Sequence, residues 1–362
     1  IAGSETGMVD IKENEIVERG RVGPGQLIAV NFKEKKFFKD HEIKKYLADT
    51  KPFGDWAKKI TYIDKLVQSA DDEFRDLDSG DLRKRMACFA WSVEDIELIL
   101  HPMIAEKKEA TGSMGDDTPL AVLSDRYRPL YHFFRQNFSQ VTNPPIDSLR
   151  ENKVMSLKTR FGNLGNILDF DNLTKQNIYV LNSPILSNSQ FEKFINFFGN
   201  NSTIIDCTFE ESNSLYEAIK KIQKDAEIAV RQGVTQLILS DKDLSISKLP
   251  IPMLLAVGAI NSFLIEKKLR GYVSINVQSG EALDTHSFAT LIGVGATTVN
   301  PYLAFDSLYQ RFEKKLFGKF SFEECVERYI KSINAGLLKI MSKMGISVLS
   351  SYRGGCNFET VG

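Results

Sequence analysis

The second half of the chain alternates short apolar runs with longer amphipathic stretches. The short runs have the length of buried strands and lie at 179–181, 203–206, 236–240, 273–277 and 296–300. Helical spacing of apolar residues, or a continuous apolar stretch of helical length, predicts helices at 214–232, 253–268, 286–293 and 322–344. Alternation of this kind predicts a mostly parallel sheet with right-handed crossovers. We therefore expect an α/β fold with an incomplete or barrel-like (β/α) domain.

The first half has a different pattern. Residues 1 to about 36 predict β-strands and turns, with one strand at 26–32, so we expect a small β-rich N-terminal segment. Asp40 is a plausible N-cap for a helix over 41–48. Without a partner domain this segment should be the more mobile part of the chain.

A helical region follows from residue 79. Ser92 and Asp95 have the spacing of a capping box and predict a helix over 93–100, which Pro102 should end. A third helix is predicted over 129–138, with its phenylalanines facing inward.

Composition and charge narrow the protein class. Of 362 residues, 43% are hydrophobic and 26% charged, which is typical of a globular protein with a real core. The net charge of −1 gives no field that would attract nucleic acid or anionic lipid. No apolar run reaches the length of a membrane-spanning helix, and the four unpatterned cysteines suit a reducing cytoplasm, so we expect a cytoplasmic protein.

Two loops have unusual backbone chemistry. Residues 111–124 read TGSMGDDTPLAVLS, and residues 140–151 read QVTNPPIDSLRE. The paired prolines Pro144 and Pro145 fix φ and remove two amide donors, and Asn143 before them is disfavoured in the helical region. We therefore expect a rigid, extended corner at this point.

These loops resemble the central domain of the glutamate synthase large subunit. Further blocks in matching order carry the same resemblance: SETG (4–7), RGRVGPGQ (19–26), HSFATLIGVGA (286–296), NPYLAF (300–305), KIMSKMGIS (339–347) and SSYRGGC (350–356). The resemblance implies residues 1–52 as the tail of a class II glutamine amidotransferase domain. It implies 53–362 as the central domain, with a helical lead-in to about 172 and a β/α part over 173–362.

The resemblance also implies a parent reaction, an oxidoreductase step of nitrogen assimilation. The family makes two glutamates from glutamine, 2-oxoglutarate and reductant, using FMN and an iron–sulfur cluster. Its glutaminase half uses an amino-terminal cysteine, whereas this chain begins with Ile1, and its four cysteines lack metal-ligand spacing. We therefore expect an internal slice of the parent enzyme that is inactive alone and holds no cofactor or metal. The expected partners are the glutaminase and FMN-binding synthase domains, with a reductase subunit left open.

The resemblance further implies that the central domain walls an internal ammonia channel. A channel wall needs small, rigid groups, and this favours the two loops. The channel or interface candidates are Thr142, Asn143, Gly112, Ser113, Asp116 and Thr118. The alternative reading is that these loops only build a domain interface.

Other residues suggest a self-sufficient enzyme instead. Asp206, Asp241 and Asn300 each end a predicted strand, the edge where α/β barrels hold catalytic groups, although helix capping is the simpler role. The glycines of 279–281 and 293–295 suggest a degenerate phosphate site. The alternative functions are thus a stand-alone barrel enzyme that binds a phosphorylated ligand or flavin, or an assembly module.

Overall fold

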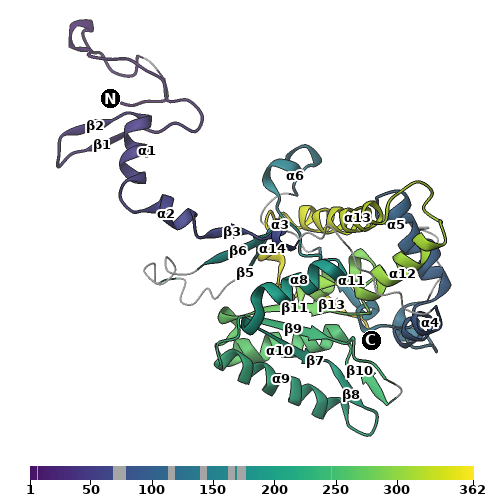
Figure 1. Ribbon diagram of the computed structural model, residues 1–362. Helices are drawn as coiled ribbons and strands as arrows, with labels where there is room; N and C mark the ends of the chain where they lie inside the picture. Colours follow the sequence, from purple (N-terminus) through teal and green to yellow (C-terminus); the bar gives the residue numbers. More distant parts are fainter. Residues whose placement is uncertain are drawn as a thin grey trace. The chain divides into compact units, whose positions relative to one another are not determined.

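The chain forms two compact units, Ile1–Lys59 and Ile60–Gly362 (Figure 1). The computed structural model describes residues 1–5, 7–67, 79–112, 119–138, 145–161, 168, 177–245 and 247–362. The predicted domain limits, 1–52 and 53–362, were drawn from the family resemblance, whereas these two units are defined by contacts within the fold. The predicted limits therefore stay predictions.

The first unit is a small hairpin with two helices. Its elements are η1 (Glu13–Glu15), β1 (Ala29–Asn31), β2 (Lys36–Phe38), α1 (Asp40–Ala48) and α2 (Phe53–Ala57). β1 and β2 pair antiparallel, and Phe38 and Ile43 are its buried apolar side chains. β pairing in the described part of this unit is confined to the hairpin, so the predicted strand at 26–32 is shorter than expected.

The start of α1 differs from the prediction in one detail. The N-cap residue is Lys39, whose backbone N–H donates to the Glu42 carboxylate at 2.8 Å. Asp40 is the first helical residue, and its carboxylate instead accepts from the Leu27 N–H at 2.9 Å. This contact spans thirteen residues, and it fastens the preceding loop to the helix.

The second unit begins with a helical lead-in that includes several short strands. In chain order its elements are β3 (Ile60–Tyr62), α3 (Asp64–Val67), α4 (Ser79–Cys88), the π-helical η2 (Asp95–Leu100), α5 (His101–Ala105), η3 (Ala121–Leu123), η4 (Leu130–Phe133), β4 (Phe134–Gln136), α6 (Ser148–Val154), β5 (Thr159–Phe161) and β6 (Ile178–Leu181). β6 pairs parallel with β3 and antiparallel with β5.

The alternating part follows. Its elements are α8 (Asn188–Phe198), η5 (Gly199–Asn201), β7 (Ser202–Asp206), β8 (Thr208–Glu210), α9 (Leu215–Arg231), β9 (Gln236–Ser240), β10 (Lys248–Pro250), α10 (Met253–Glu266), η6 (Arg270–Tyr272), β11 (Ser274–Gln278), α11 (Thr285–Gly293), β12 (Thr298–Asn300), α12 (Tyr302–Glu313), α13 (Phe322–Lys343), α14 (Leu349–Tyr352) and β13 (Phe358–Thr360). The predicted helices and strands of this half are confirmed to within one or two residues at most ends.

The main sheet is parallel throughout, in the order β12-β11-β9-β7. It stays open: among the described residues, the outer edge of β12 meets only a short bridge at Ile185. The parallel, barrel-like architecture is confirmed, without a closed barrel. Strand pairs β8–β10 and β4–β13 are antiparallel and lie outside this sheet.

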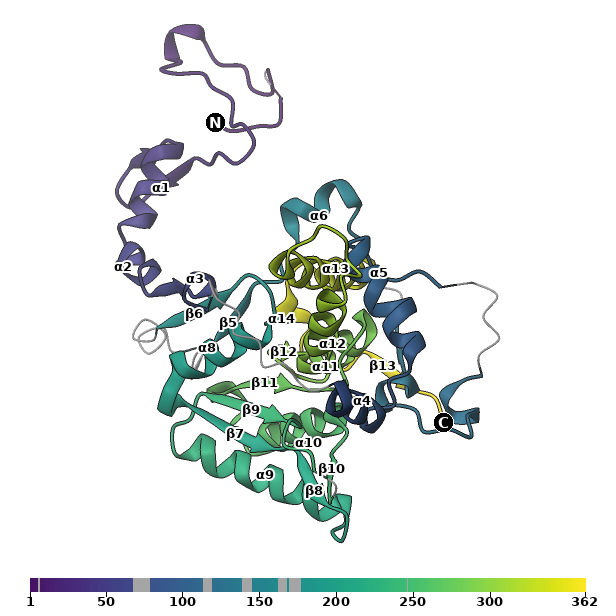
Figure 2. The ribbon, with the colours of Figure 1, turned by 45° about the vertical axis from the view of Figure 1, so that its right-hand side comes forward.

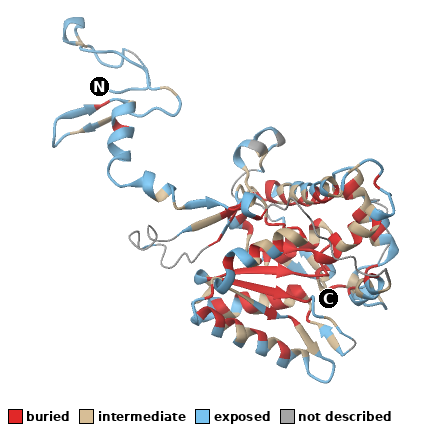
Figure 3. Cartoon of the chain, in the orientation of Figure 1, coloured by how far each residue is buried: buried red, intermediate tan, exposed pale blue. Residues whose placement is uncertain are grey.

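Helices cover both faces of the sheet (Figures 1 and 2). α9, α10 and α11 build the larger apolar core with β9 and β11. α8 lies on the other face, where Phe191, Phe194 and Phe198 pack with Ile238 of β9. Every residue of β9 and β11 is therefore buried (Figure 3), as expected for parallel strands covered on two sides.

Two local predictions for the lead-in need correction. Ser92 and Asp95 do exchange backbone–side-chain hydrogen bonds, of 2.6 and 3.2 Å, so the capped start is confirmed. Pro102 does not end the helix, however. η2 runs directly into α5, and Pro102 lies at the point where the π-helical turns change to α-helix.

The helix predicted over 129–138 is wrong. Residues 130–133 form a single 3₁₀ turn, and β4 then pairs antiparallel with β13, more than two hundred residues away. Gln136 also bonds at its side chain to Asn357 O at 2.8 Å and accepts from Tyr352 at 2.6 Å. Long-range pairing thus overrides the local helical pattern.

Two mid-helix glycines offer a test of the packing. A Cβ on Gly336 of α13 would overlap Thr285 of α11, whereas a Cβ on Gly258 of α10 would meet no atom within 4 Å. We expect Gly258→Ala to stabilise the chain by up to about 1 kcal/mol through helix propensity. Gly336→Ala should destabilise it by about 1–3 kcal/mol through overpacking. Urea unfolding of both variants measures this, and shifts of the same sign would contradict the α11–α13 packing.

Candidate functional site

The predicted channel residues lie mostly outside the described part of the chain. Ser113, Asp116, Thr118, Thr142 and Asn143 belong to that group, and their roles stay predictions. Gly112 is described and exposed, and a Cβ there would meet no atom within 4 Å. Packing against the described residues therefore does not require a glycine at position 112.

The flanks of both loops are fastened to the C-terminal end of α13. Before the first loop, Glu109 forms an ion pair with Lys339. Within the second, just after the paired prolines, the Ile146 N–H donates to Ser342 O at 3.0 Å. Just before the second loop, the Lys343 ammonium lies 6.0 Å from the Phe138 ring centroid. The structure thus brings both loop flanks to the stretch 339–343, a juxtaposition that local sequence patterns do not predict.

The three strand-end residues have different roles. Asp206 is exposed and accepts from the Thr208 N–H and hydroxyl at 3.0 and 2.7 Å, so it caps the turn into β8 and not a helix. Asn300 is buried and donates to Leu186 O and Asn188 Oδ1 at 3.0 and 2.9 Å. Asp241 is fully buried. Only the last two are therefore part of the interior.

Buried side chains cross the sheet in two hydrogen-bonded layers. In the first layer, Asn276 donates to Gln236 Oε1 at 3.1 Å and accepts from the Thr298 hydroxyl at 2.7 Å. These side chains come from three neighbouring strands. They satisfy one another, as buried polar groups must.

The second layer lies at the carboxyl end of the strands. The Ser240 hydroxyl donates to Gln278 Oε1 at 2.9 Å, and Gln278 Nε2 donates to Asn300 Oδ1 at 3.1 Å. The chain of bonds continues through Asn188 of α8 to Asp306 of α12, where the distance is 2.9 Å. Burial raises the pKa of the Asp306 carboxyl to about 7.

Two buried carboxyls flank this layer. Asp241 accepts from the Ser279 hydroxyl at 2.6 Å and from the Gly280 N–H at 3.0 Å. Glu281 accepts from the N–H of Met253, the first residue of α10, at 3.1 Å and so caps that helix. Spacing in the sequence gave no indication of Glu281, because its partners lie some 28 and 40 residues away.

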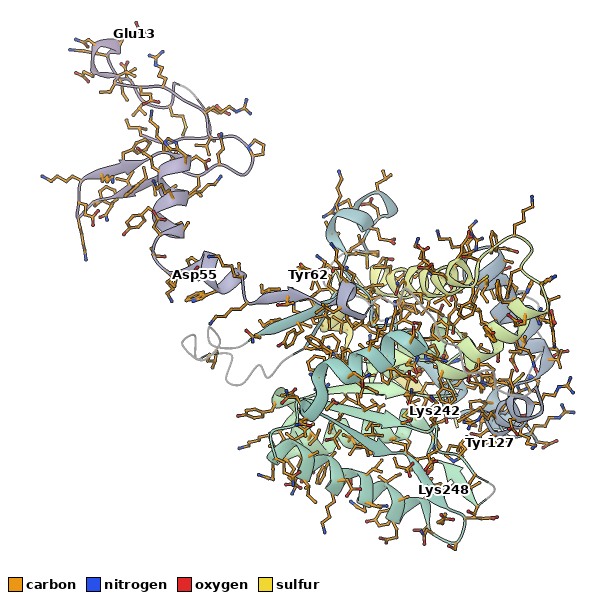
Figure 4. The ribbon with its side chains drawn as sticks, viewed as in Figure 1. Glu13, Asp55, Tyr62, Tyr127, Lys242 and Lys248 are labelled. Carbon is orange, nitrogen blue, oxygen red and sulfur yellow. The ribbon has the colours of Figure 1, made fainter. Side chains whose placement is uncertain are left out.

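Burial sets the protonation of this acid pair. Loss of solvation is the main cause that raises the pKa of Asp241 to about 6 and of Glu281 to about 8, and the Asp241 charge raises Glu281 further. The two carboxyls therefore titrate as a coupled pair near neutral pH. Lys242 directly follows Asp241 and is exposed, and Tyr127 lies at the same edge of the unit (Figure 4).

The chain's own side chains fill the edge where a barrel enzyme binds its ligand. At that edge a Cβ on Gly280 would overlap the Phe89 ring. At the C-terminal end of α11, away from that edge, a Cβ on Gly293 would overlap Phe358 and one on Gly295 would come within 2.6 Å of Asn261. Both predicted glycine cradles therefore face packed protein, which contradicts the phosphate-site reading.

The described residues also show neither a metal-ligand cluster nor an activated thiol at this edge. Within the described residues no three His, Cys, Asp or Glu side chains are grouped to hold a metal ion. Burial raises the pKa of the Cys207 thiol well above its usual range, which disfavours the nucleophilic thiolate. Among the described residues no helix is both long and apolar enough to cross a membrane.

Comparisons with known proteins match this architecture to one family. A family model described as "Glutamate synthase central domain" matches residues 84–362, and one described as "Glutamine amidotransferases class-II" matches residues 1–56. Over its full length the chain is 52% identical to the NADPH glutamate synthase large chain of Azospirillum brasilense and 42% identical to that of Bacillus subtilis. It is 39% identical to the ferredoxin-dependent glutamate synthase 2 of Synechocystis.

The match covers only part of those relatives. The chain spans 24% of the length of each of these three proteins. Among solved structures, the flavin-binding domain of baker's yeast flavocytochrome b2 aligns with a TM-score of 0.31 and 15% identity. That alignment covers 42% of this chain and 41% of the other, and its TM-score is too low to support any argument.

The acid pair predicts a defined pH dependence of stability. Because the folded state holds the Glu281 proton more tightly than the unfolded chain, stability should fall as pH rises from about 5 to 8. Glu281→Gln keeps an acceptor for the Met253 N–H and removes this titration. Relative to wild type, the variant should gain about 2–4 kcal/mol over that range.

Urea unfolding at pH 5, 6, 7 and 8 measures the effect. Glu192→Gln, which removes an exposed carboxylate of α8, is the matched control and should follow wild type. Parallel pH profiles for wild type and Glu281→Gln would show that Glu281 is not held protonated in the fold.

Proposed function

The chain belongs to the glutamate synthase central-domain family, and from this premise we propose that it acts as a linking and channel domain rather than as a catalyst. It joins a glutaminase domain to an FMN-binding synthase domain and helps to wall the path of ammonia between them. The reaction served is the conversion of glutamine, 2-oxoglutarate and reductant to two glutamates. A reductase subunit is a further candidate partner, and we place the protein in the cytoplasm.

The filled strand edge is the observation that carries the non-catalytic part of the proposal. In α/β barrels this edge provides the ligand site. Here Phe89 packs on Gly280, Glu281 caps α10, and Asp241 is bonded to Ser279 and Gly280 in the loop after β11. Because these groups are engaged with one another, we assign them to the core. FMN and the iron–sulfur cluster would then belong to other parts of the enzyme.

The two family matches support the linking role. Residues 1–56 resemble a glutaminase-type domain and 84–362 the central domain, so one chain carries parts of both. The first unit and the second unit each have their own buried residues. A linker that joins two reaction centres needs this kind of organisation.

The anchoring on α13 supports the channel role. Lys339, Ser342 and Lys343 contact the flanks of both loops. A long helix that holds two loops at one end fixes their separation, and a passage for a small neutral molecule requires a fixed width. We propose that Thr142 and Asn143 line this passage, with Gly112, Ser113, Asp116 and Thr118 beside it.

The competing functions are less well supported. A stand-alone enzyme needs an accessible strand edge, and Phe89 occupies it. An assembly module remains a distinct alternative for the two loops, because an interface and a channel wall place similar demands on rigidity. The two are separated by experiment below.

We expect the isolated chain to be inactive. Supplied with glutamine, 2-oxoglutarate and a reductant, it should release no ammonia, because the family's glutaminase reaction uses an amino-terminal cysteine and this chain has Ile1 there. It should form no glutamate, because its four scattered cysteines lack the spacing for the cluster and Phe89 packs into its strand edge. Coupled enzyme assays measure both products, with the complete Azospirillum brasilense relative as a positive control. Stoichiometric flavin absorbance in the purified chain, or glutamate formation by it, would favour the stand-alone enzyme.

Substitution of Thr142 tests the channel. In the complete enzyme, Thr142→Phe should leave glutamine hydrolysis active but release several-fold more ammonia to solvent per glutamate formed. The reason is steric, since an aromatic ring in a narrow passage blocks ammonia without touching either reaction. The measurement is the ratio of free ammonia to glutamate.

Thr142→Ser is the matched control, because it keeps the hydroxyl and removes only a methyl group. It should couple like wild type. If Thr142→Phe keeps the wild-type ratio while the enzyme remains assembled, the corner is an interface and the channel role of Thr142 is wrong.

A further inference from the structure

Two arginines meet at the C-terminal end of α11 without an acidic partner. Arg270, in η6, donates to Asn261 Oδ1 at 2.7 Å, to Val273 O at 2.6 Å and to Gly295 O at 2.9 Å. All three acceptors are neutral. The guanidinium therefore keeps its full charge in a partly buried position.

Arg353 is brought to the same place by the turn after α14. The Gly354 N–H donates to Ile292 O at 3.1 Å, and the Cys356 N–H donates to Gly293 O at 2.9 Å. These bonds fix the turn against the end of α11, next to the Gly295 carbonyl that Arg270 holds. Arg353 is partly buried, and in the described part of the chain its guanidinium makes no hydrogen bond or ion pair.

The electrostatics point to a local excess of positive charge. Burial is the main cause that lowers the pKa of Arg270 to about 10, and the charge of Arg353 lowers it further. Burial also lowers the pKa of Arg353. No described carboxylate offsets either effect. The carbonyls at the end of α11 compensate only a fraction of one charge.

A desolvated cation without a counter-charge is costly, and proteins pair such groups with an anion. An arginine fork fits the oxygens of a carboxylate or a phosphate with two parallel hydrogen bonds. We infer that Arg353, with Arg270 beside it, forms a binding site for one oxyanion, either a carboxylate or a phosphate group. Arg353 makes the direct contact and Arg270 adds charge from its fixed position.

This site is separate from both regions described above. It lies at the C-terminal end of α11, whereas the filled edge lies at the carboxyl ends of the strands. It also differs from the glycine cradle expected at 293–295, because the ligand would contact guanidinium groups rather than backbone N–H groups. A carboxylate here would come from an acidic side chain packed against the unit, and a phosphate from a small ligand.

Thermal unfolding of the 362-residue chain with added anions tests the inference. Sodium phosphate and sodium acetate are titrated separately, with ionic strength held constant by sodium chloride. A ligand that binds only the folded chain raises the unfolding temperature in a saturable way. We expect wild type to show a rise of several degrees, and the anion that acts at lower concentration identifies the preferred group.

Three variants locate the effect. Arg353→Met should abolish the anion-dependent rise, and Arg353→Lys should reduce it because a single ammonium replaces the planar fork. Arg83→Met removes an exposed arginine of α4 and should keep the wild-type rise. If Arg353→Met does not fold, Arg353→Lys serves for the same comparison.

The inference is overturned by either of two results. One is the lack of a saturable rise in wild type with both anions. The other is an undiminished rise after substitution of Arg353, which would place the binding elsewhere.

Discussion

The fold depends on the need to satisfy polar side chains buried on one face of the parallel sheet. Gln236, Asn276 and Thr298 bond across three strands, and a second layer runs from Ser240 to Asn300. Left unpaired, each group would cost about 1–3 kcal/mol. The strands must therefore keep their register, and α8 and α12 must sit where Asn188 and Asp306 complete the second layer. These hydrogen bonds hold the carboxyl ends of the strands in place although the sheet does not close into a barrel.

That fixed edge explains how a barrel-like architecture can serve as a scaffold. The positions that would face a ligand are used for internal contacts: Phe89 lies on Gly280, and Glu281 caps α10. Burial leaves Asp241 and Glu281 with raised pKa values, a property often found at active sites. Here the carboxyls bond to backbone and hydroxyl groups of the core. A shifted pKa shows in the first place that the group has lost its solvation. It indicates catalysis only where a substrate can reach the group.

α13 links this core to the loops that bear on function. Its middle packs on α11 through Gly336, and its end contacts the flanks of both loops through Lys339, Ser342 and Lys343. The ion pair of Lys339 with Glu109 lies near the surface, where such pairs contribute little stability. The backbone bond from Ile146 to Ser342 and the burial of α13 therefore matter more for positioning.

The sequence by itself determined the elements whose signals are local. The apolar stripe of α9, the buried run of β9, and the Ser92–Asp95 cap were all predicted, because each depends on neighbours within a few residues. The order of the family blocks also identified the family. Tertiary structure decided what depends on distant residues. β4 is a strand because β13 pairs with it, and the glycines of 280 and 293 are packing sites because Phe89 and Phe358 reach them. Asp241 and Glu281 form an acid pair for the same reason. No local pattern encodes such contacts, since they form only when segments from about forty to more than two hundred residues apart fold into one core.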